Sequence, residues 1–222
     1  MIKTVITDLE QLQERCDEID VLKENSLVRE TTLNLKHTIQ ANNYTHLSAP
    51  QIGVNKRIMC VNFRGDIRTM INPATQNVRG FVLSRESNAS LPGKEFILPR
   101  NAEISVVYQT PTGKIQSNTF KGKAAFVVQD ALSTLDGLYI SDVGLPLLEG
   151  WDELEEKDKD VIISDYLESL DIKKKELDKD IEEDEELKQI SDGAKFLQGL
   201  ASGQIQIEKG EVINKNIEKD NK

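Results

Sequence analysis

The strongest structural signal in this chain is the stretch KAAFVVQDALSTLDG at residues 123–137. Its apolar side chains recur at helical spacing and form one broad stripe: Ala124, Ala125, Val128, Ala131, Leu132 and Leu135. The stretch predicts a helix over 123–135 that ends at Asp136-Gly137, because glycine commonly follows the last helical turn. A stripe this wide predicts that the helix is buried across a sheet.

Strands are expected on the amino-terminal side of this helix. Residues 102–109 alternate apolar and polar side chains, and residues 115–120 can return as their partner after a Pro-Thr-Gly turn at 111–113. Residues 57–63 predict a further strand. Because these strands stand beside helical segments, the sequence predicts an α+β domain.

Two helices are expected before the strands. Thr7 and Glu10 have the spacing of a capping box, and apolar residues follow at helical spacing as far as Ile19. A second helix is expected to start at Asn25-Ser26 and to end near residues 42–43.

Charge divides the chain into two parts. Residues 1–150 contain 16 basic and 16 acidic side chains, whereas residues 151–222 contain 12 and 22 and so carry the whole net charge of −10. We therefore expect a domain over 1–150 and an acidic, mainly helical extension over 151–222 that ends in a short strand-like segment.

The composition argues against several classes of protein. The acidic balance disfavours a nucleic acid or an anionic membrane as partner, and no apolar run approaches the ~18–20 residues that span a bilayer. The amino terminus lacks the apolar stretch of a signal peptide. Cys16 and Cys60 are expected to be buried thiols in a reducing compartment, so a cytoplasmic location is expected.

Three short stretches follow one another at characteristic separations: YTHLSAPQIG at 44–53, ESNASLP at 86–92 and QDALSTLDG at 129–137. Together they resemble the three signature motifs of peptide deformylases, roughly GxGL[AS]APQIG, E[GA]CLSxP and QHExDHLxG. The resemblance covers about residues 5–148. It implies a peptide-deformylase-like domain with mixed or antiparallel strands around a buried helix.

The resemblance also implies a metal-dependent reaction whose key residues are changed here. In the family, the cysteine of the second motif and two histidines of the third hold a metal, and the intervening glutamate moves a proton. The positions that match the family's site, vestigial under this interpretation, are Gln51, Asn88, Ala89, Asp130, Ala131 and Thr134. Of the family's catalytic side chains only the glutamine is retained, so we expect no catalytic residue, no metal, no cofactor and no enzymatic activity.

Two questions stay open at this stage. The oxygen donors of Asn88, Asp130 and Thr134 could hold Mg²⁺ or Ca²⁺, or could form a hydrogen-bonded polar core. Tyr44 and His46 replace the two glycines of the first motif. Their side chains could plug the pocket or could be exposed loop residues.

The extension is expected to contain the partner-binding surface. Residues 204–212 alternate apolar and polar side chains and could add as a strand to another subunit's sheet through Ile205, Ile207 and Val212. The partners would then be other protein subunits of a larger assembly, with no nucleic acid and no membrane involved.

The function predicted from the sequence is thus a catalytically inactive deformylase-like fold used as a structural or assembly protein. One specific version is a bacteriophage virion component in the neck or head–tail connector, located in the virion. Two alternatives are a module that binds a peptide terminus without cleaving it and a hydrolase with a rebuilt active site. Trp151, at the start of the extension, is expected to be a packing residue.

Overall fold

The computed structural model describes the backbone of residues 1–183, 205–208 and 211–214, and the side chains of residues 1–170. The chain divides into two compact units, Met1–Glu153 and Leu154–Lys222. Among the described helices, none combines the length and the apolarity that crossing a membrane requires.

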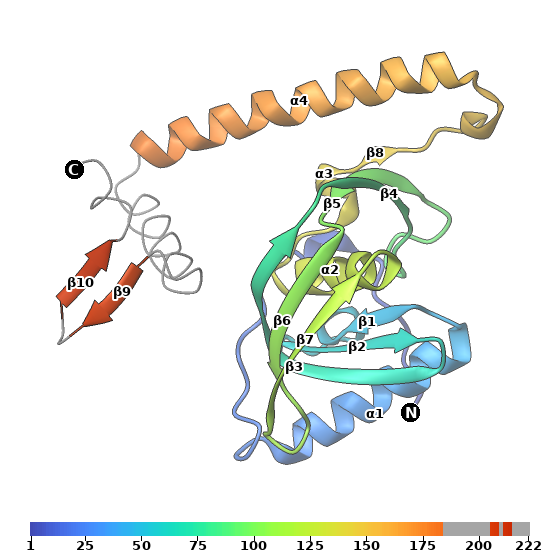
Figure 1. The fold of residues 1–222 in the computed structure, drawn as a ribbon. Coiled ribbons are helices and arrows are strands. Elements are labelled where there is room, and N and C mark those ends of the chain that lie inside the picture. The colour runs from blue at the N-terminus through green and yellow to red at the C-terminus, as the bar shows by residue number, and fades with distance from the viewer. Residues whose placement is uncertain (184–204, 209–210, 215–222) are drawn as a thin grey trace. The chain divides into compact units, whose positions relative to one another are not determined.

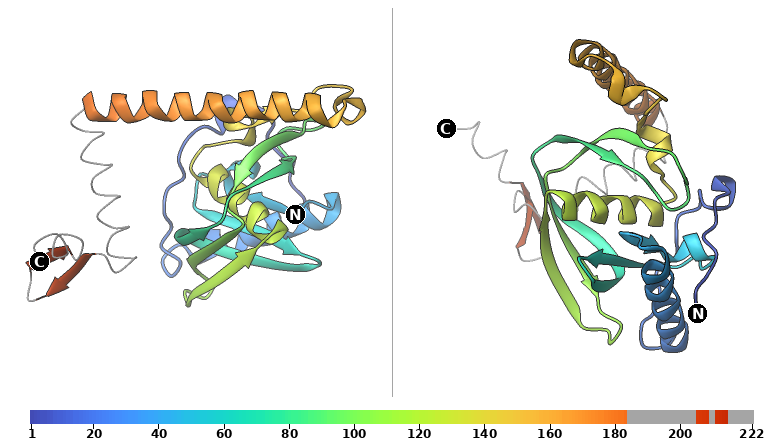
Figure 2. Two further views of the ribbon diagram at one scale, coloured as in Figure 1. Left: turned by 45° about the horizontal axis from the view of Figure 1, so that its top comes forward. Right: turned by 90° about the vertical axis from the view of Figure 1, so that its right-hand side faces the viewer.

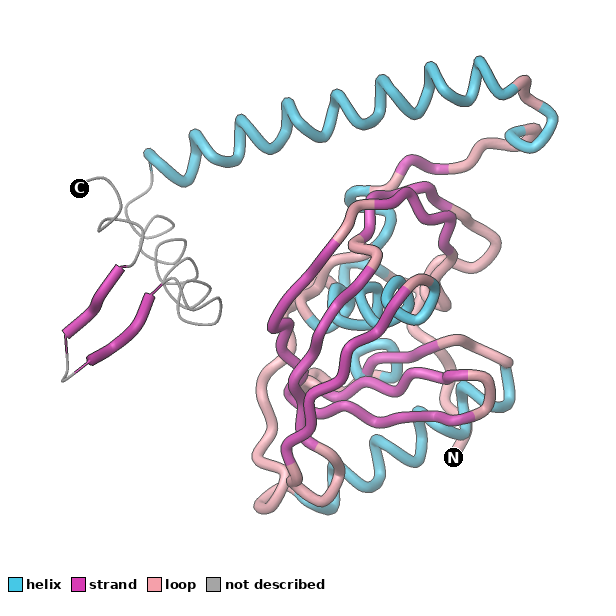
Figure 3. The backbone as a smooth tube through the Cα atoms, viewed as in Figure 1, coloured by secondary structure: helices cyan, strands magenta, loops and turns pink. Residues whose placement is uncertain are grey.

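The first unit is an α+β domain, as predicted (Figures 1 and 3). Its helices are α1 (Asn25–Asn42), α2 (Lys123–Leu135) and α3 (Ile140–Val143), with short 3-10 turns η1 (Leu9–Gln11), η2 (Ala49–Ile52) and η3 (Trp151–Glu153). Its strands are β1 (His46–Ser48), β2 (Ile58–Phe63), β3 (Asp66–Arg79), β4 (Val82–Glu86), β5 (Phe96–Arg100), β6 (Glu103–Gln109), β7 (Ile115–Lys121) and β8 (Leu145–Pro146). The predicted bounds of α1 and α2 are confirmed.

All neighbouring strands of this unit run antiparallel. One sheet has the order β1-β2-β3-β6-β7, and a smaller sheet has the order β4-β5-β8, which leaves β4 at an edge. The predicted hairpin is the β6–β7 pair.

The larger sheet lies between two helices, and β2 shows how its side chains divide. Met59 and Val61 pack in the apolar cluster that contains α2, whereas Ile58 and Cys60 pack in the cluster that contains α1. Successive side chains of a strand point to opposite faces, so a strand covered on both faces is apolar throughout. Figure 2 shows α1 and α2 on opposite sides of these strands. Both cysteines are buried and free, as predicted.

The carboxyl end of α2 is fixed by two contacts. Arg57 donates to Asp136 at 2.6 Å and to the Leu135 carbonyl at 3.4 Å, which satisfies acceptors at the helix end. Gly137 has a φ of +74°, and a Cβ there would lie 2.6 Å from the Gln13 carbonyl oxygen. Only glycine fits this close approach.

The helix predicted over 7–19 is wrong, since the structure has only the 3-10 turn η1. Its amino-terminal cap is Asp8, which accepts from the Glu10 N–H, so the capping box at Thr7 is also wrong. The backbone of this segment bonds to other elements instead of to itself: Cys16 N–H donates to Leu135 and Ile19 N–H to the Asn72 side chain. The apolar spacing of the segment places side chains in the core without a helix.

The second unit contains the helix α4 (Glu156–Glu183) and a hairpin of β9 (Ile205–Glu208) and β10 (Glu211–Asn214). A mainly helical extension was expected, and the structure has one continuous helix as far as residue 183; residues 184–204 lie outside the described part. In the hairpin, Val212 is opposite Ile207 and Asn214 is opposite Ile205. Side chains of this hairpin lie outside the described residues, so their predicted partner contacts stay a prediction.

Candidate active site

Gln51, on the short turn η2, links the first and second motifs. Its side-chain oxygen accepts from Ser48 N–H at 2.9 Å, and its amide nitrogen donates to Asn88 Oδ1 at 3.0 Å and to Ser90 Oγ at 3.1 Å. The side chain is fully buried. Every hydrogen of the Gln51 amide is therefore used inside the domain.

Asn88 carries the connection on to α2. Its Nδ2 donates to Asp130 Oδ2 at 2.9 Å, while its Oδ1 also accepts from Ser90 N–H at 2.9 Å. The structure thus brings together Gln51, Asn88 and Asp130, three of the positions that the sequence singled out. We call these three side chains the floor.

The other three positions that the sequence singled out have side chains that serve the packing of the domain. Thr134 is buried and donates its hydroxyl hydrogen to the Asp130 carbonyl one turn earlier at 3.0 Å. Ala131 is buried in the α2 cluster, and its carbonyl accepts from Ser48 Oγ at 2.9 Å. Ala89 packs against the apolar cluster of α1.

His46 faces the floor. Its Nε2 lies 3.1 Å from Asp130 Oδ2, and its side chain is only 4% exposed. Burial alone would raise the pKa of the Asp130 carboxyl, but its contacts with His46, the Arg100 charge and the Asn88 hydrogen bond together lower that pKa below its ordinary value. His46 is therefore a buried member of the site, not an exposed loop residue. Tyr44 instead packs beside the α1 cluster.

The side chains at the metal positions do not fit the ion that the family uses. Thr134 is committed to its own helix, and both polar groups of the Asn88 amide are hydrogen-bonded within the site. No group of three His, Cys, Asp or Glu side chains in the described part of the chain is arranged to hold a metal. An amide, a hydroxyl and one carboxylate are also a weak donor set for a zinc- or iron-like ion.

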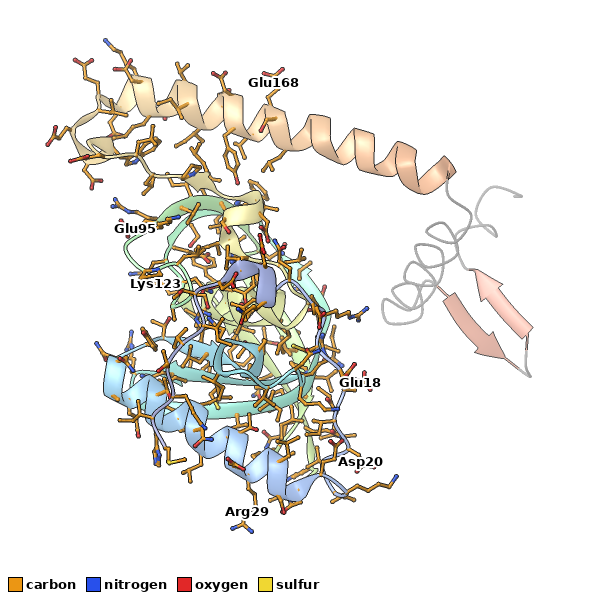
Figure 4. All side chains as sticks on the ribbon, turned by 180° about the vertical axis from the view of Figure 1, so that it is seen from behind. Glu18, Asp20, Arg29, Glu95, Lys123 and Glu168 are labelled. Carbon is orange, nitrogen blue, oxygen red and sulfur yellow. The ribbon has the colours of Figure 1, made fainter. Side chains whose placement is uncertain are left out.

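A cavity of about 520 Å³ opens above His46 and Asp130. Its walls are Thr45 and His46 at β1, residues 83–87 along β4, and Lys123, Phe126, Val127 and Asp130 on α2. Lys123 begins α2 and is labelled in Figure 4. Cavities of this size with apolar walls and a few polar groups are typical of small-ligand or peptide sites.

Ion pairs hold the β4 wall of this cavity. Glu86 and Arg100 form a pair of hydrogen bonds at 2.9 and 2.8 Å, and both side chains are largely buried. At the outer edge, Arg85 contacts Glu95 at 2.6 Å and Asp152 at 2.8 Å. We call this exposed group the rim. No motif marked Arg85 or Lys123 as a site residue, whereas Thr45 adjoins His46 in the first motif and could have been found there.

The fold and the site define an antiparallel α+β domain whose crossing helix and edge strand enclose a peptide-sized cavity. A family model described as "Polypeptide deformylase" matches residues 2–145, and the chain belongs to this family. Similar proteins include the peptide deformylase of Dictyoglomus thermophilum, 32% identical over 122 residues, which are 55% of this chain and 80% of that protein. That of Symbiobacterium thermophilum is 30% identical over 125 residues, 55% and 58% of the two chains.

Solved structures agree on the fold. A K3U-bound class I type b peptide deformylase from Acinetobacter baumannii has a TM-score of 0.61 at 21% identity, covering 64% of this chain and 98% of that one. A peptide deformylase from Legionella pneumophila has a TM-score of 0.61 at 22% identity, covering 64% and 85%.

These findings correct the prediction that the chain is not an enzyme. The matching family and the similar proteins carry the name of an enzyme, so the comparisons point toward catalysis. The prediction was wrong because it treated the loss of the metal ligands as the loss of all chemistry. His46 and Asp130 line the cavity, so polar groups remain at this site.

Proposed function

We propose that this chain binds the amino-terminal end of a polypeptide in the cavity between β4 and α2 and acts there as a hydrolase with a rebuilt active site. The observation that carries the proposal is the cavity itself, with an edge strand as one wall and with His46 and Asp130 among its lining residues. The family membership supports an amino-terminal peptide as the ligand class.

An extended peptide fits the free side of β4. This strand pairs only with β5 within its sheet, so its outer N–H and C=O groups can pair with an added strand. Leu83 is 38% exposed beside this edge and lies across the cavity from Phe126 and Val127. These three apolar side chains suit contact with the first side chain of the peptide from both walls of the cavity. The related deformylase from Acinetobacter baumannii has been solved with Met-Ala-Ser bound.

Calorimetric titration with Met-Ala-Ser and with its N-formyl form tests the proposal. Leu83→Asp should weaken binding at least ~10-fold, because losing the burial of an apolar side chain costs about 1.5–3 kcal/mol. The matched control is Ile115→Asp on β7, which changes a side chain that is 68% exposed and outside the cavity. Unchanged binding in Leu83→Asp, or equal losses in both variants, would place the peptide elsewhere.

The assembly role of the extension, in a bacteriophage neck or connector or in another complex, stays a prediction. Its support is the charge of residues 151–222 and the exposure of Val161 and Ile162 on α4. A truncation should end after Glu153, because Trp151 is buried and Asp152 pairs with Arg85. Co-purification from the native source should then lose the partner subunits with the truncated chain and keep them with the full chain. Equal recovery would move the interface to the first unit.

A further inference from the structure

Three side chains beside the cavity stand in a row that the deformylase motifs do not account for. Thr45 Oγ1 lies 3.3 Å from His46 Nδ1, and His46 Nε2 lies 3.1 Å from Asp130 Oδ2. All three residues line the cavity. Thr45 is exposed there, while His46 and Asp130 are 4% and 2% exposed. An accessible hydroxyl is thus followed by a buried imidazole and a buried carboxylate.

The nearby Asp130 carboxylate favours the imidazole tautomer with its hydrogen on Nε2. An ionised Asp130 can only accept, so the ring hydrogen belongs on Nε2, and Nδ1 is left as the acceptor for the Thr45 hydroxyl. Asp130 is held in place by Asn88 at 2.9 Å and by the Arg100 charge at 3.7 Å. A hydroxyl beside a base, with the base oriented by a third group, is the arrangement that activates a nucleophile.

Two buried atoms of this row are incompletely satisfied. His46 Nε2 and Asp130 Oδ1 have no hydrogen-bond partner among the described residues, although Nε2 is close to Asp130 Oδ2. The two atoms are therefore close to one another but are not aligned as a straight hydrogen bond. Buried polar atoms of this kind are uncommon and need an explanation. A pair that aligns only when substrate fills the cavity supplies one.

We infer that Thr45 is a nucleophile that accepts the acyl group from an acylated peptide terminus, with His46 as its base and Asp130 as the positioning residue. This inference rests on the proposed function. Thr45 Oγ bonds to the carbonyl carbon while the hydroxyl proton moves to His46 Nδ1. The bond from that carbon to the peptide nitrogen breaks, and the nitrogen takes the proton from His46. Water then attacks the Thr45 ester, releases the acid and restores the hydroxyl.

The charges of the site suit these steps. The imidazolium that forms on His46 faces the Asp130 carboxylate. Lys123 is exposed on the α2 wall of the same cavity and supplies a positive charge toward the oxyanion. No metal enters any step, because the donors at the family's metal positions are committed to hydrogen bonds.

The test uses the full chain with a p-nitrophenyl ester of a short acid, followed by intact mass and peptide mapping. Wild type should form an acyl adduct on Thr45. Thr45→Val, which removes the hydroxyl at nearly constant volume, should lose the adduct and slow nitrophenol release by at least ~100-fold, whereas Thr45→Ser should retain both. The matched control is Thr112→Val, which removes an exposed threonine hydroxyl in the turn between β6 and β7, outside the cavity, and should leave the rate unchanged.

Peptide binding distinguishes the two proposals. Thr45→Val should bind Met-Ala-Ser within about twofold of wild type, since only the reacting group is lost. An adduct on another residue, or full turnover by Thr45→Val, would overturn the nucleophile. If wild type binds the peptide but shows no Thr45-dependent acylation, the catalytic roles of Thr45, His46 and Asp130 are overturned and the proposed binding site stands. Failure of wild type to bind the peptide at all would instead overturn the proposed function.

Discussion

The floor and the rim both contain charged side chains, but only the floor is withdrawn from water. Asp130 in the floor is 2% exposed, whereas the Arg85 side chain in the rim is 43% exposed. Buried partners lose hydration that nothing but the protein can replace, while exposed partners exchange readily with water. The same types of contact should therefore differ greatly in what their removal does.

The largest expected effect follows from removing the charge of the floor. Asp130→Ala leaves the buried Asn88 amide and the buried His46 ring without the carboxylate that they face, while Arg100 keeps Glu86, so the free energy of unfolding should fall by about 3–5 kcal/mol. Urea denaturation measures this change. The rim control, Asp152→Ala, should unfold like wild type. Similar losses in both variants would erase the distinction between floor and rim.

Removing a neutral member of the floor should have a smaller effect. Gln51→Leu leaves Ser90 Oγ without its donor and the buried Ser48 N–H without its acceptor, and should cost about 1–3 kcal/mol of unfolding free energy. Its matched control is Gln116→Leu, since Gln116 is exposed and accepts only from Tyr108 at 3.1 Å. Equal denaturation midpoints for the two variants would contradict the prediction.

Lowering the pH should remove the stabilisation of the fold by the Asp130 carboxylate. The pKa of its carboxyl is lower in the folded state than in the unfolded state, near 3.9, so the carboxylate stabilises the fold above that pH. This stability is lost as the pH falls through the folded pKa. The difference in unfolding free energy between wild type and Asp130→Asn should be constant above about pH 5 and shrink below about pH 4. If this difference in unfolding free energy grew at low pH, the pKa of Asp130 would be raised by folding instead of lowered.

The rim should give the smallest effect. Arg85→Gln removes the contacts to Glu95 and Asp152, but these groups are exposed and screened by salt. We expect a melting temperature equal to that of wild type at both low and high salt. A clear, salt-sensitive drop would show that the rim stabilises the start of the extension.

The fold was predictable where local signals were strong. The apolar stripe of α2 and the alternation in β6 are periodic over many residues, and their bounds could be read from sequence. Residues 7–19 have apolar residues at helical spacing without forming a helix, because Leu135 and Asn72 supply partners for the backbone. Those partners are distant in sequence, so no local pattern contains them.

The sequence predicted which positions form the site, but not how their side chains interact. The motifs placed Gln51, Asn88 and Asp130 correctly beside one another. They did not show that His46 would turn toward Asp130, since that depends on the backbone conformation of the first motif. Thr45 was missed because its significance comes only from the orientation of the neighbouring ring.

The direction of the hydrogen bonds in the floor bears on the history of the site. Gln51 donates to Asn88, and Asn88 donates to a carboxylate that can only accept. A residue at position 130 that presents an N–H group would face the NH₂ group of Asn88, so that two donors would meet. Rotating the Asn88 amide by half a turn would relieve this conflict, but it would place the Asn88 NH₂ group against the NH₂ group of Gln51. Ancestral changes at positions 88 and 130 would thus have depended on one another, and a reversion at either one alone should be disfavoured.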